Sequence, residues 1–425
     1  MLLGFGCMDS PQAGEYAYGV GYTAEHSDNI ALVPVDERSD TIHSMVVGMA
    51  YQEHTADVVA HVLAQATYNR YQNNSYGDET LYDLNSSAVW TISPQRFLWT
   101  LQDVYQQGLV DSTGVYTPTN RTNLNILSTG PDVYLHLSPV HTIQFGARVG
   151  DVNTGDVNAD NKRTSGTAAW LYMPSAIMTL SLNYQVLDVQ YDDTVLNNDF
   201  RGQDVFFRIQ SQPSLSTYML DVGKTHVNFA RGDDANGSLA RLSWTRRSTP
   251  ESSFGLSASK EFLNTGTDVL NTSTTPTTAS GTTSIVTSDV YTSKGGSIFY
   301  NHQGSQFGLK FQAEKRKLDF VLTTQDRKET NGNLQLSYLF NGATTTASVY
   351  TDYSRIEYID LDRRDVERNT GVRLDYRLSR DISLGLEGSR HDRDSTLPTY
   401  VFVDNRVLFS VAYSSGPLFT PQRRK

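Results

Sequence analysis

The chain has 425 residues, and its 46 acidic side chains against 35 basic ones give a formal charge of −11, which argues against nucleic acid as a partner. A single cysteine, Cys7, excludes a disulfide framework and a cysteine-based zinc site. Only 38% of the residues are hydrophobic, so no large apolar core is expected, and no run approaches the roughly 18 apolar residues of a membrane helix.

The first segment in chain order is 1–13. Its Met1–Met8 part is apolar, but it has neither a basic region nor an A-x-A-like cleavage site. We interpret it as either the remnant of a signal peptide or a plain apolar N-terminus. Residues 14–413 follow as one domain, because no Pro/Gly linker separates parts of different composition. Residues 414–425 form a C-terminal basic tail.

Within 14–413, nearly every segment outside the loops alternates apolar with polar or small residues, which is the period of a strand with two different faces. Gly371–Ser379 and Phe307–Glu314 are clear examples. In Asp204–Gln210 the residue Phe206 interrupts the polar face. Around Gln185–Gln190 the polar and apolar positions exchange faces, which we attribute to a β-bulge.

Two kinds of connection alternate strictly between these segments. Tight breaks are predicted at His54-Thr55, Ser93-Pro94, Ser138-Pro139, Pro174-Ser175, Pro213-Ser214, Thr249-Pro250, Gln303-Gly304, Asn341-Gly342 and Arg380-Asp381. Longer polar connections are predicted near 25–39, 72–79, 110–121, 151–163, 190–200, 230–236, 263–289, 319–328, 357–365 and 391–399. The alternation predicts an all-β, up-and-down antiparallel meander of about 20 strands, with 18 as the alternative, and places both termini at the short-turn end.

This asymmetry favours a transmembrane β-barrel of the bacterial outer membrane, which has short periplasmic turns, long external loops and an even strand number. A closed barrel also pairs every backbone group in hydrocarbon, so the partner on the outside is outer-membrane lipid. Aromatic residues near strand ends are expected to form girdles at the headgroup level: Tyr16, Tyr51, Tyr68, Trp90, Trp99, Trp170, Tyr172, Tyr184, Trp244, Tyr300, Tyr338 and Tyr413.

The alternation also predicts which charged side chains line the lumen. The predicted pore-lining residues are Arg148, Asp204, Arg208, Arg241, Lys310, Glu314, Arg373, Asp375, Arg377 and Glu387. They either set the selectivity of a water-filled pore or form a ladder of ion pairs that stiffens the barrel, and the two interpretations are compatible.

About 20 strands should enclose an aqueous lumen unless a loop folds inward. The candidate for such a plug is the Thr/Ser-rich stretch Leu263–Ser288. Its low-complexity composition favours a mobile loop outside the barrel instead.

Signatures of catalysis are absent from the sequence. There is no G-x-S-x-G, P-loop or Rossmann fingerprint, and the nine His lack the spacing of a zinc site. The acidic segments 150–160 and 357–365 do not match a calcium loop, so we interpret them as solvated. We therefore expect no enzyme activity, no catalytic residue, no cofactor and no metal.

Several segments resemble a known family. Gly19–Ser44 (GVGYTAEHSDNIALVPVDERSDTIHS), Tyr68–Ser75 (YNRYQNNS), Ser93–Gly114 (SPQRFLWTLQDVYQQGLVDSTG) and Val372–Ser395 (VRLDYRLSRDISLGLEGSRHDRDS) are similar to EpsL-like outer-membrane β-barrels, a porin family associated with exopolysaccharide biosynthesis. The resemblance implies a role in producing or exporting an extracellular polysaccharide, with the polysaccharide chain and periplasmic export components as partners. The family offers no catalytic residues to carry over.

The expected function is therefore a porin-like, passive polar channel associated with exopolysaccharide export. Two alternatives remain open: a general diffusion porin, and an occluded structural barrel that partners a periplasmic protein. A soluble, secreted all-β protein is a third; it would bury its apolar faces against one another.

Overall fold

The computed structural model describes residues 12–155, 158–274, 286–340 and 344–416. No helix in these residues is long and apolar enough to cross a membrane. The one α-helix they contain, α1 (Thr265–Thr274), lies between β13 and β14. The strands are β1 (Gln12–Ser27), β2 (Asp40–His54), β3 (Val58–Tyr71), β4 (Glu79–Ser93), β5 (Phe97–Leu109), β6 (Arg121–Ser138), β7 (His141–Asn153), β8 (Asn161–Ser175), β9 (Met178–Tyr191), β10 (Phe200–Ser211), β11 (Ser216–Phe229), β12 (Ala235–Thr249), β13 (Ser252–Leu263), β14 (Tyr291–Gln303), β15 (Phe307–Phe320), β16 (Arg327–Phe340), β17 (Thr345–Tyr358), β18 (Arg363–Arg377), β19 (Ile382–Ser395) and β20 (Phe402–Ser414).

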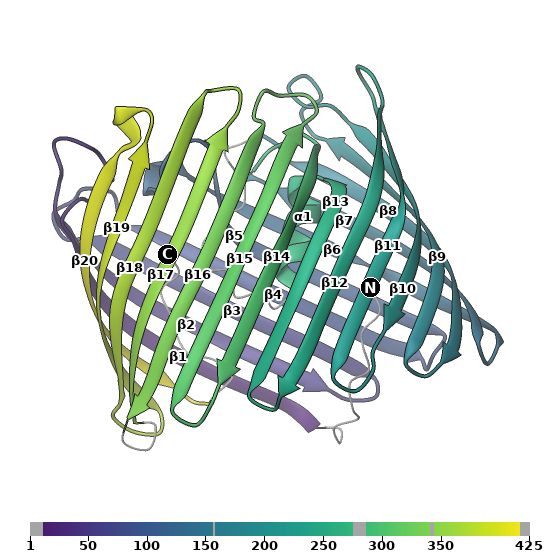
Figure 1. Ribbon diagram of the computed structural model, residues 1–425, viewed down its shortest axis with the longest axis horizontal. Helices are drawn as coiled ribbons and strands as arrows, with labels where there is room; N and C mark the ends of the chain where they lie inside the picture. The colour runs from purple at the N-terminus through teal and green to yellow at the C-terminus, as the bar shows by residue number, and fades with distance from the viewer. Residues whose placement is uncertain (1–11, 156–157, 275–285, 341–343, 417–425) are drawn as a thin grey trace.

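Each strand pairs antiparallel with the next one in the chain. The sheet closes where β1 pairs with β20, from Gly19 opposite Ser414 to Ser27 opposite Arg406. The result is a closed barrel of tilted strands, with β1 to β5 on the far wall and β12 to β18 on the near wall in Figure 1. The prediction of about 20 strands is confirmed, and closure leaves no unpaired sheet edge.

The alternation of connections is also confirmed. Nine connections have two to four residues and lie at one end of the barrel, the short-turn end, where β1 begins and β20 ends. The ten connections at the opposite end, the long-loop end, have four to 27 residues. Every predicted break falls in or beside one of these connections, although Asn341-Gly342 itself lies outside the described residues.

The outer surface is apolar. Along β15 the outward Phe307 and Phe311 keep 44% and 38% of their surface exposed, and exposed residues of the same kind surround the barrel. Examples are Val205, Val222, Leu242, Ile298, Leu336, Val349, Leu374, Leu386, Val407 and Phe409. An apolar surface of this extent requires a lipid environment, since it would be costly to leave it in water. The protein is accordingly a transmembrane β-barrel of the bacterial outer membrane, the location of barrels with this architecture.

The aromatic positions predicted from the sequence all fall on outward positions of the register. Tyr16, Trp90 and Trp99 represent the majority that lie toward the short-turn end, where they are exposed by 74%, 38% and 37%. Tyr68, exposed by 41%, lies near the long-loop end. The predicted girdle is therefore best developed at the short-turn end.

The predicted bulge at Gln185–Gln190 is wrong. β9 pairs with β8 and β10 without a register shift over these residues. Leu187 and Val189 face the lumen because they belong to an apolar cluster inside the barrel, which also contains Val290 from the connection between β13 and β14. The exchange of faces thus marks an apolar contact in the lumen.

The closing seam between β1 and β20 is reinforced at its long-loop end. The hydroxyl of Ser27 donates to Oδ1 of Asp404 at 2.6 Å, and the backbone N–H of Asn29 donates to the same oxygen at 3.3 Å. Arg406 forms an ion pair with the same carboxylate. Asp404 is fully buried, so these three donors replace the water that its charge would otherwise require.

Candidate pore lining

The predicted charges of β10 and β12 meet across the lumen face of β11. Arg208 donates from Nε to Asp221 at 2.7 Å, and Arg241 reaches the same carboxylate at 3.4 Å. Arg241 also pairs with Glu261 of β13 at 2.7 Å. Asp221 is fully buried. These side chains form one continuous chain of alternating charge across four strands, as the ion-pair interpretation expects.

Phe206, which interrupts the polar face of β10, is part of the same arrangement. Its ring is almost fully buried, with the guanidinium groups of Arg208 and Arg241 at 5.3 and 5.7 Å from its centroid. An aromatic face attracts a cation in this way, so the ring supports both arginines from one side. The predicted Asp204 lies nearby and accepts a hydrogen bond from Thr225 at 2.5 Å.

A second group of predicted residues meets on β18 and β19. Arg373 pairs with Asp375 at 2.9 Å and with Glu387 at 3.4 Å. The Tyr350 hydroxyl donates to Glu387 at 2.5 Å. On the other side of the barrel, Arg148 pairs with Asp132 of β6 at 2.5 Å.

The remaining predicted residues do not join these networks. Lys310 of β15 and Arg377 of β18 are exposed and form no ion pair with any described residue. Both lie near the short-turn end. Glu314 is half-buried and shares the lumen face of β15 with Arg316. The ten predicted residues therefore comprise six ion-paired charges in the wall, two exposed cations near the mouth at the short-turn end, and two carboxylates, Asp204 and Glu314, outside these ion pairs.

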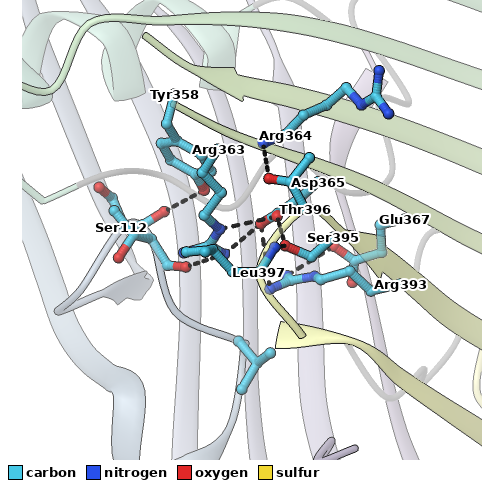
Figure 2. Close-up of polar contacts among 12 residues, drawn as sticks. Ser112, Tyr358, Arg363, Arg364, Asp365, Glu367, Arg393, Ser395, Thr396 and Leu397 are labelled. Atoms are coloured by element: carbon cyan, nitrogen blue, oxygen red, sulfur yellow. Dashed lines mark hydrogen bonds and ion pairs between the residues drawn. The ribbon is translucent and has the colours of Figure 1, made fainter. Parts of the chain in front are cut away.

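Sequence reasoning missed a denser network close to the long-loop end of β18 and β19, drawn in Figure 2. Arg363 donates from Nε to Asp365 at 2.9 Å, and Arg393 pairs with Glu367 at 3.0 Å. His391 contacts the other oxygen of Glu367 at 2.5 Å. The signal was available, because Arg363, Asp365 and Glu367 alternate along one face, but the acidic segment 357–365 was interpreted as solvated.

The loop 110–120, between β5 and β6, crosses the lumen to reach this network. The backbone oxygen of Thr113 accepts a hydrogen bond from Arg363 at 2.8 Å, and that of Ser112 accepts one from the Tyr358 hydroxyl at 3.2 Å (Figure 2). The Arg363 guanidinium lies 3.4 Å from the ring centroid of Tyr400. The loop from one wall is thus tied to the opposite wall.

The connection 264–290 also folds inward, and the expectation of a mobile loop outside the barrel is wrong for its described parts. Val269 of α1 and Val286 are 3% and 5% exposed, and they pack against lumen-facing Val104, Leu124, Ile126 and Val152. Figure 1 shows α1 behind the near wall. The prediction rested on composition, whereas burial of apolar side chains on the facing wall provides the free energy that orders the segment. Residues 275–285 lie outside the described part.

Polar contacts hold the start of this connection. Asp268 accepts a hydrogen bond from the Tyr291 hydroxyl at 2.8 Å and lies 3.8 Å from Arg316. Arg163 of β8 donates to the Thr267 hydroxyl at 2.7 Å. A Cβ atom at Gly266 would come within 1.7 Å of the Arg163 guanidinium, so a larger residue there would displace this guanidinium from its position beside Thr267.

The end of the connection is held by Asp289. Its carboxylate accepts hydrogen bonds from the backbone N–H groups of Leu322 and Thr323 at 3.1 and 2.9 Å, and from the Thr323 hydroxyl at 2.9 Å. Burial raises the pKa of the Asp289 carboxyl, while these hydrogen bonds act in the opposite direction. Tyr191 donates to the Ser288 backbone oxygen at 2.8 Å. Both ends of the inward segment are therefore fixed to the barrel.

The described residues contain no group of three or more His, Cys, Asp or Glu side chains that could hold a metal ion. Most of the charged side chains described above for the wall are paired with one another. The lumen near the long-loop end is narrowed by the loop 110–120 and by the described parts of 264–290, above a wall of paired charges.

No protein-family model matches the sequence, and no curated protein matches it. Among solved structures, OccK2 (OpdF) of Pseudomonas aeruginosa is similar over 95% of this chain and 98% of its own, with 10% identity and a TM-score of 0.40. The copper transporter OprC covers 95% of this chain and 81% of its own, with 9% identity and a TM-score of 0.47. The FrpB iron transporter from Neisseria meningitidis covers 96% and 83%, with 9% identity and a TM-score of 0.47. Identities of 9–10% and TM-scores below 0.5 are too low to support an argument about this protein. The fold is therefore established by the strand pairings of this chain alone, and nothing about its substrate follows from the similarities.

Proposed function

We propose that the protein is a passive outer-membrane channel whose aperture is set near the long-loop end by two inward connections, the loop 110–120 and the described parts of 264–290. The anchoring of both segments to opposite walls is the observation that supports this proposal most directly. A barrel of this size leaves space that side chains of the wall alone do not fill. Segments held inside by specific contacts would define which solutes pass.

The short-turn half of the lumen supports an aqueous path. Lumen-facing His61, Lys310 and Arg377 are exposed in this half. Solvent therefore reaches side chains inside the wall at this end. A hydrophilic solute would enter or leave through this mouth and meet the constriction on its way across the membrane.

We further propose that the solute is an extracellular polysaccharide and that periplasmic export components meet the short-turn end. The resemblance of four segments to the exopolysaccharide-associated barrels supports this assignment. The chemistry of the wall is compatible with it, because paired charges present hydrogen-bonding groups with little net charge. Such a surface suits a neutral or weakly charged sugar chain better than a small ion.

The test is single-channel conductance in a planar bilayer, comparing the intact protein with a variant in which 266–288 is replaced by a short Gly/Ser linker. We expect a steady conductance in the intact protein and a larger one in the variant. Silence in both, with heat-modifiable mobility confirming a folded barrel, would refute the channel and favour the occluded structural barrel.

Substrate class is tested in the same bilayers. Adding exopolysaccharide from the producing strain on the short-turn side should block the current at concentrations where dextran of equal length does not. Equal block by both polymers, or by neither, would contradict the polysaccharide assignment and favour a general diffusion porin.

A further inference from the structure

Four lysines on the outer surface lie directly opposite one another on consecutive strands. Lys260 of β13 pairs with Lys294 of β14, Lys294 with Lys317 of β15, and Lys317 with Lys328 of β16. We refer to these four residues as the lysine row. Like charges directly opposite one another in a sheet are destabilising, so three successive Lys–Lys pairs need an explanation.

Acidic neighbours relieve only part of this repulsion. Asp319 is shared by Lys294, at 3.2 Å, and Lys317. Glu357 lies 3.9 Å from Lys328 and also pairs with Arg355. Two carboxylates thus serve three of the four lysines and one arginine, while Lys260 donates to the Ser238 hydroxyl at 2.6 Å, so the row keeps an excess of positive charge.

Further cations surround the row. Lys224 of β11 and Lys315 of β15 are exposed on outward positions and form no ion pair with a described residue. Arg364 and Arg368 of β18 are also exposed, although Arg368 pairs with Asp392 and Asp394. At the corresponding level of the opposite half, the outward residues include Asp151 of β7 and Asp188 of β9. Outward cations also occur in the opposite half, such as Lys162 of β8 opposite Asp151, but the unbroken succession of facing lysines lies on β13 to β16, among the strands that face the viewer in Figure 1.

The position of the row along the barrel axis indicates what it binds. It lies in the half of the strands nearest the long loops, which is the external side of an outer-membrane barrel. Along β14, the next outward residues from Lys294 toward the middle of the membrane are Gly296 and then Ile298, which is 51% exposed. Phe311 of β15 and Leu334 of β16 lie in the same apolar band, each exposed by 38%. The cations therefore border directly on the lipid-facing surface.

We propose that the lysine row binds the phosphate groups of a phosphorylated glycolipid in the outer leaflet, with its acyl chains lying on the apolar band below. Phosphate oxygens between facing ammonium groups convert repulsion into charge-assisted hydrogen bonds. A polysaccharide without acyl chains would use the cations but leave the adjoining apolar residues without a role. For this reason a lipid fits the surface better than a glycan.

The experiment measures binding of bisphosphorylated lipid A to the full-length barrel in detergent, by thermal shift and by titration. The test variant is Lys260→Gln/Lys328→Gln, at the two ends of the row. The matched control is Arg70→Gln/Lys162→Gln, which removes two exposed outward cations from β3 and β8. We expect roughly a tenfold or greater loss of affinity in the test variant and little change in the control.

A second readout separates ligand binding from a structural role. Without lipid A, the thermal midpoint of the test variant should equal or exceed that of the wild type, because the substitutions remove repulsion. Wild-type binding should weaken with ionic strength and with dephosphorylated lipid A. Equal affinity in both variants, equal binding of the dephosphorylated lipid, or tighter binding of an acidic polysaccharide would each overturn the proposal.

Discussion

At the scale of single residues, the barrel uses charge in two ways that burial distinguishes. Asp221, Asp404 and Arg363 are buried and each has several polar partners. Lys310 and Arg377 are exposed in the lumen. A buried charge that loses its partner is left without water to replace it, whereas an exposed charge is already solvated.

This difference gives a prediction for two arginines of β18. Arg363→Ala leaves the buried Asp365 without its closest cation, so we expect the free energy of unfolding to fall by about 3 kcal/mol. Arg368→Ala removes an exposed arginine that pairs with Asp392 and Asp394 at 3.1 and 3.0 Å, and should cost at most about 1 kcal/mol.

Both free energies are measured by reversible urea unfolding of the refolded barrel in lipid vesicles. Equal losses in the two variants would show that the tie between Arg363, Asp365 and the loop at Thr113 does not contribute to stability. Alternation along single strands is enough to select candidates such as Arg208 and Arg241 for the lumen face. Their partners could not be predicted, because a pairing such as Arg241 with Asp221 depends on the register between strands.

At the scale of elements, the connection 264–290 shows how composition can mislead. Its Thr/Ser-rich sequence predicts no stable structure by itself, yet Val269 and Val286 find apolar partners on β5, β6 and β7. Those partners are distant in sequence, so no local pattern reveals the contact. The exchange of faces at Gln185–Gln190 was a local trace of a separate contact of the same connection, that of Leu187 and Val189 with the cluster containing Val290, since apolar residues at lumen positions need something apolar to cover them.

The anchor of α1 can be tested with a matched pair of substitutions. Val269→Asp places a charge against Val104, Leu124 and Ile126, so we expect the segment to leave its position and the single-channel conductance to rise. Val195→Asp makes the same chemical change in the loop between β9 and β10, where the side chain is 82% exposed.

The control variant should conduct like the wild type, and both should keep the heat-modifiable mobility of a folded barrel. An unchanged conductance in Val269→Asp would indicate that the apolar contact does not hold the constriction, and that Asp268 and Asp289 suffice.

At the scale of the whole molecule, the strict alternation of connection lengths allowed the architecture to be predicted closely. Strand number, antiparallel order and the common end of both terminal strands all follow from where the turns fall. This works because turn residues are local signals, and a meander requires no long-range information to define its order. Aromatic residues such as Trp90 and Trp99 could be placed on the outer surface because the alternation within a strand is also a local signal.

The orientation of the barrel gives a further prediction. In a Cys7→Ser background, Val195→Cys lies in a long loop and should react on intact cells with a membrane-impermeant maleimide. Ile177→Cys lies in the short turn between β8 and β9, is 51% exposed, and should react only after the outer membrane is permeabilised. The reverse labelling pattern would mean that the long loops face the periplasm.

The seam between β1 and β20 also constrains the order of assembly. All other neighbouring strands are consecutive in the chain, but the seam joins residues such as Ser27 and Asp404 that are 377 positions apart. Hairpins can therefore form as soon as their own residues are available, while closure must wait for the last strand. Until then β1 presents an open hydrogen-bonding edge, which makes the incomplete barrel prone to aberrant pairing.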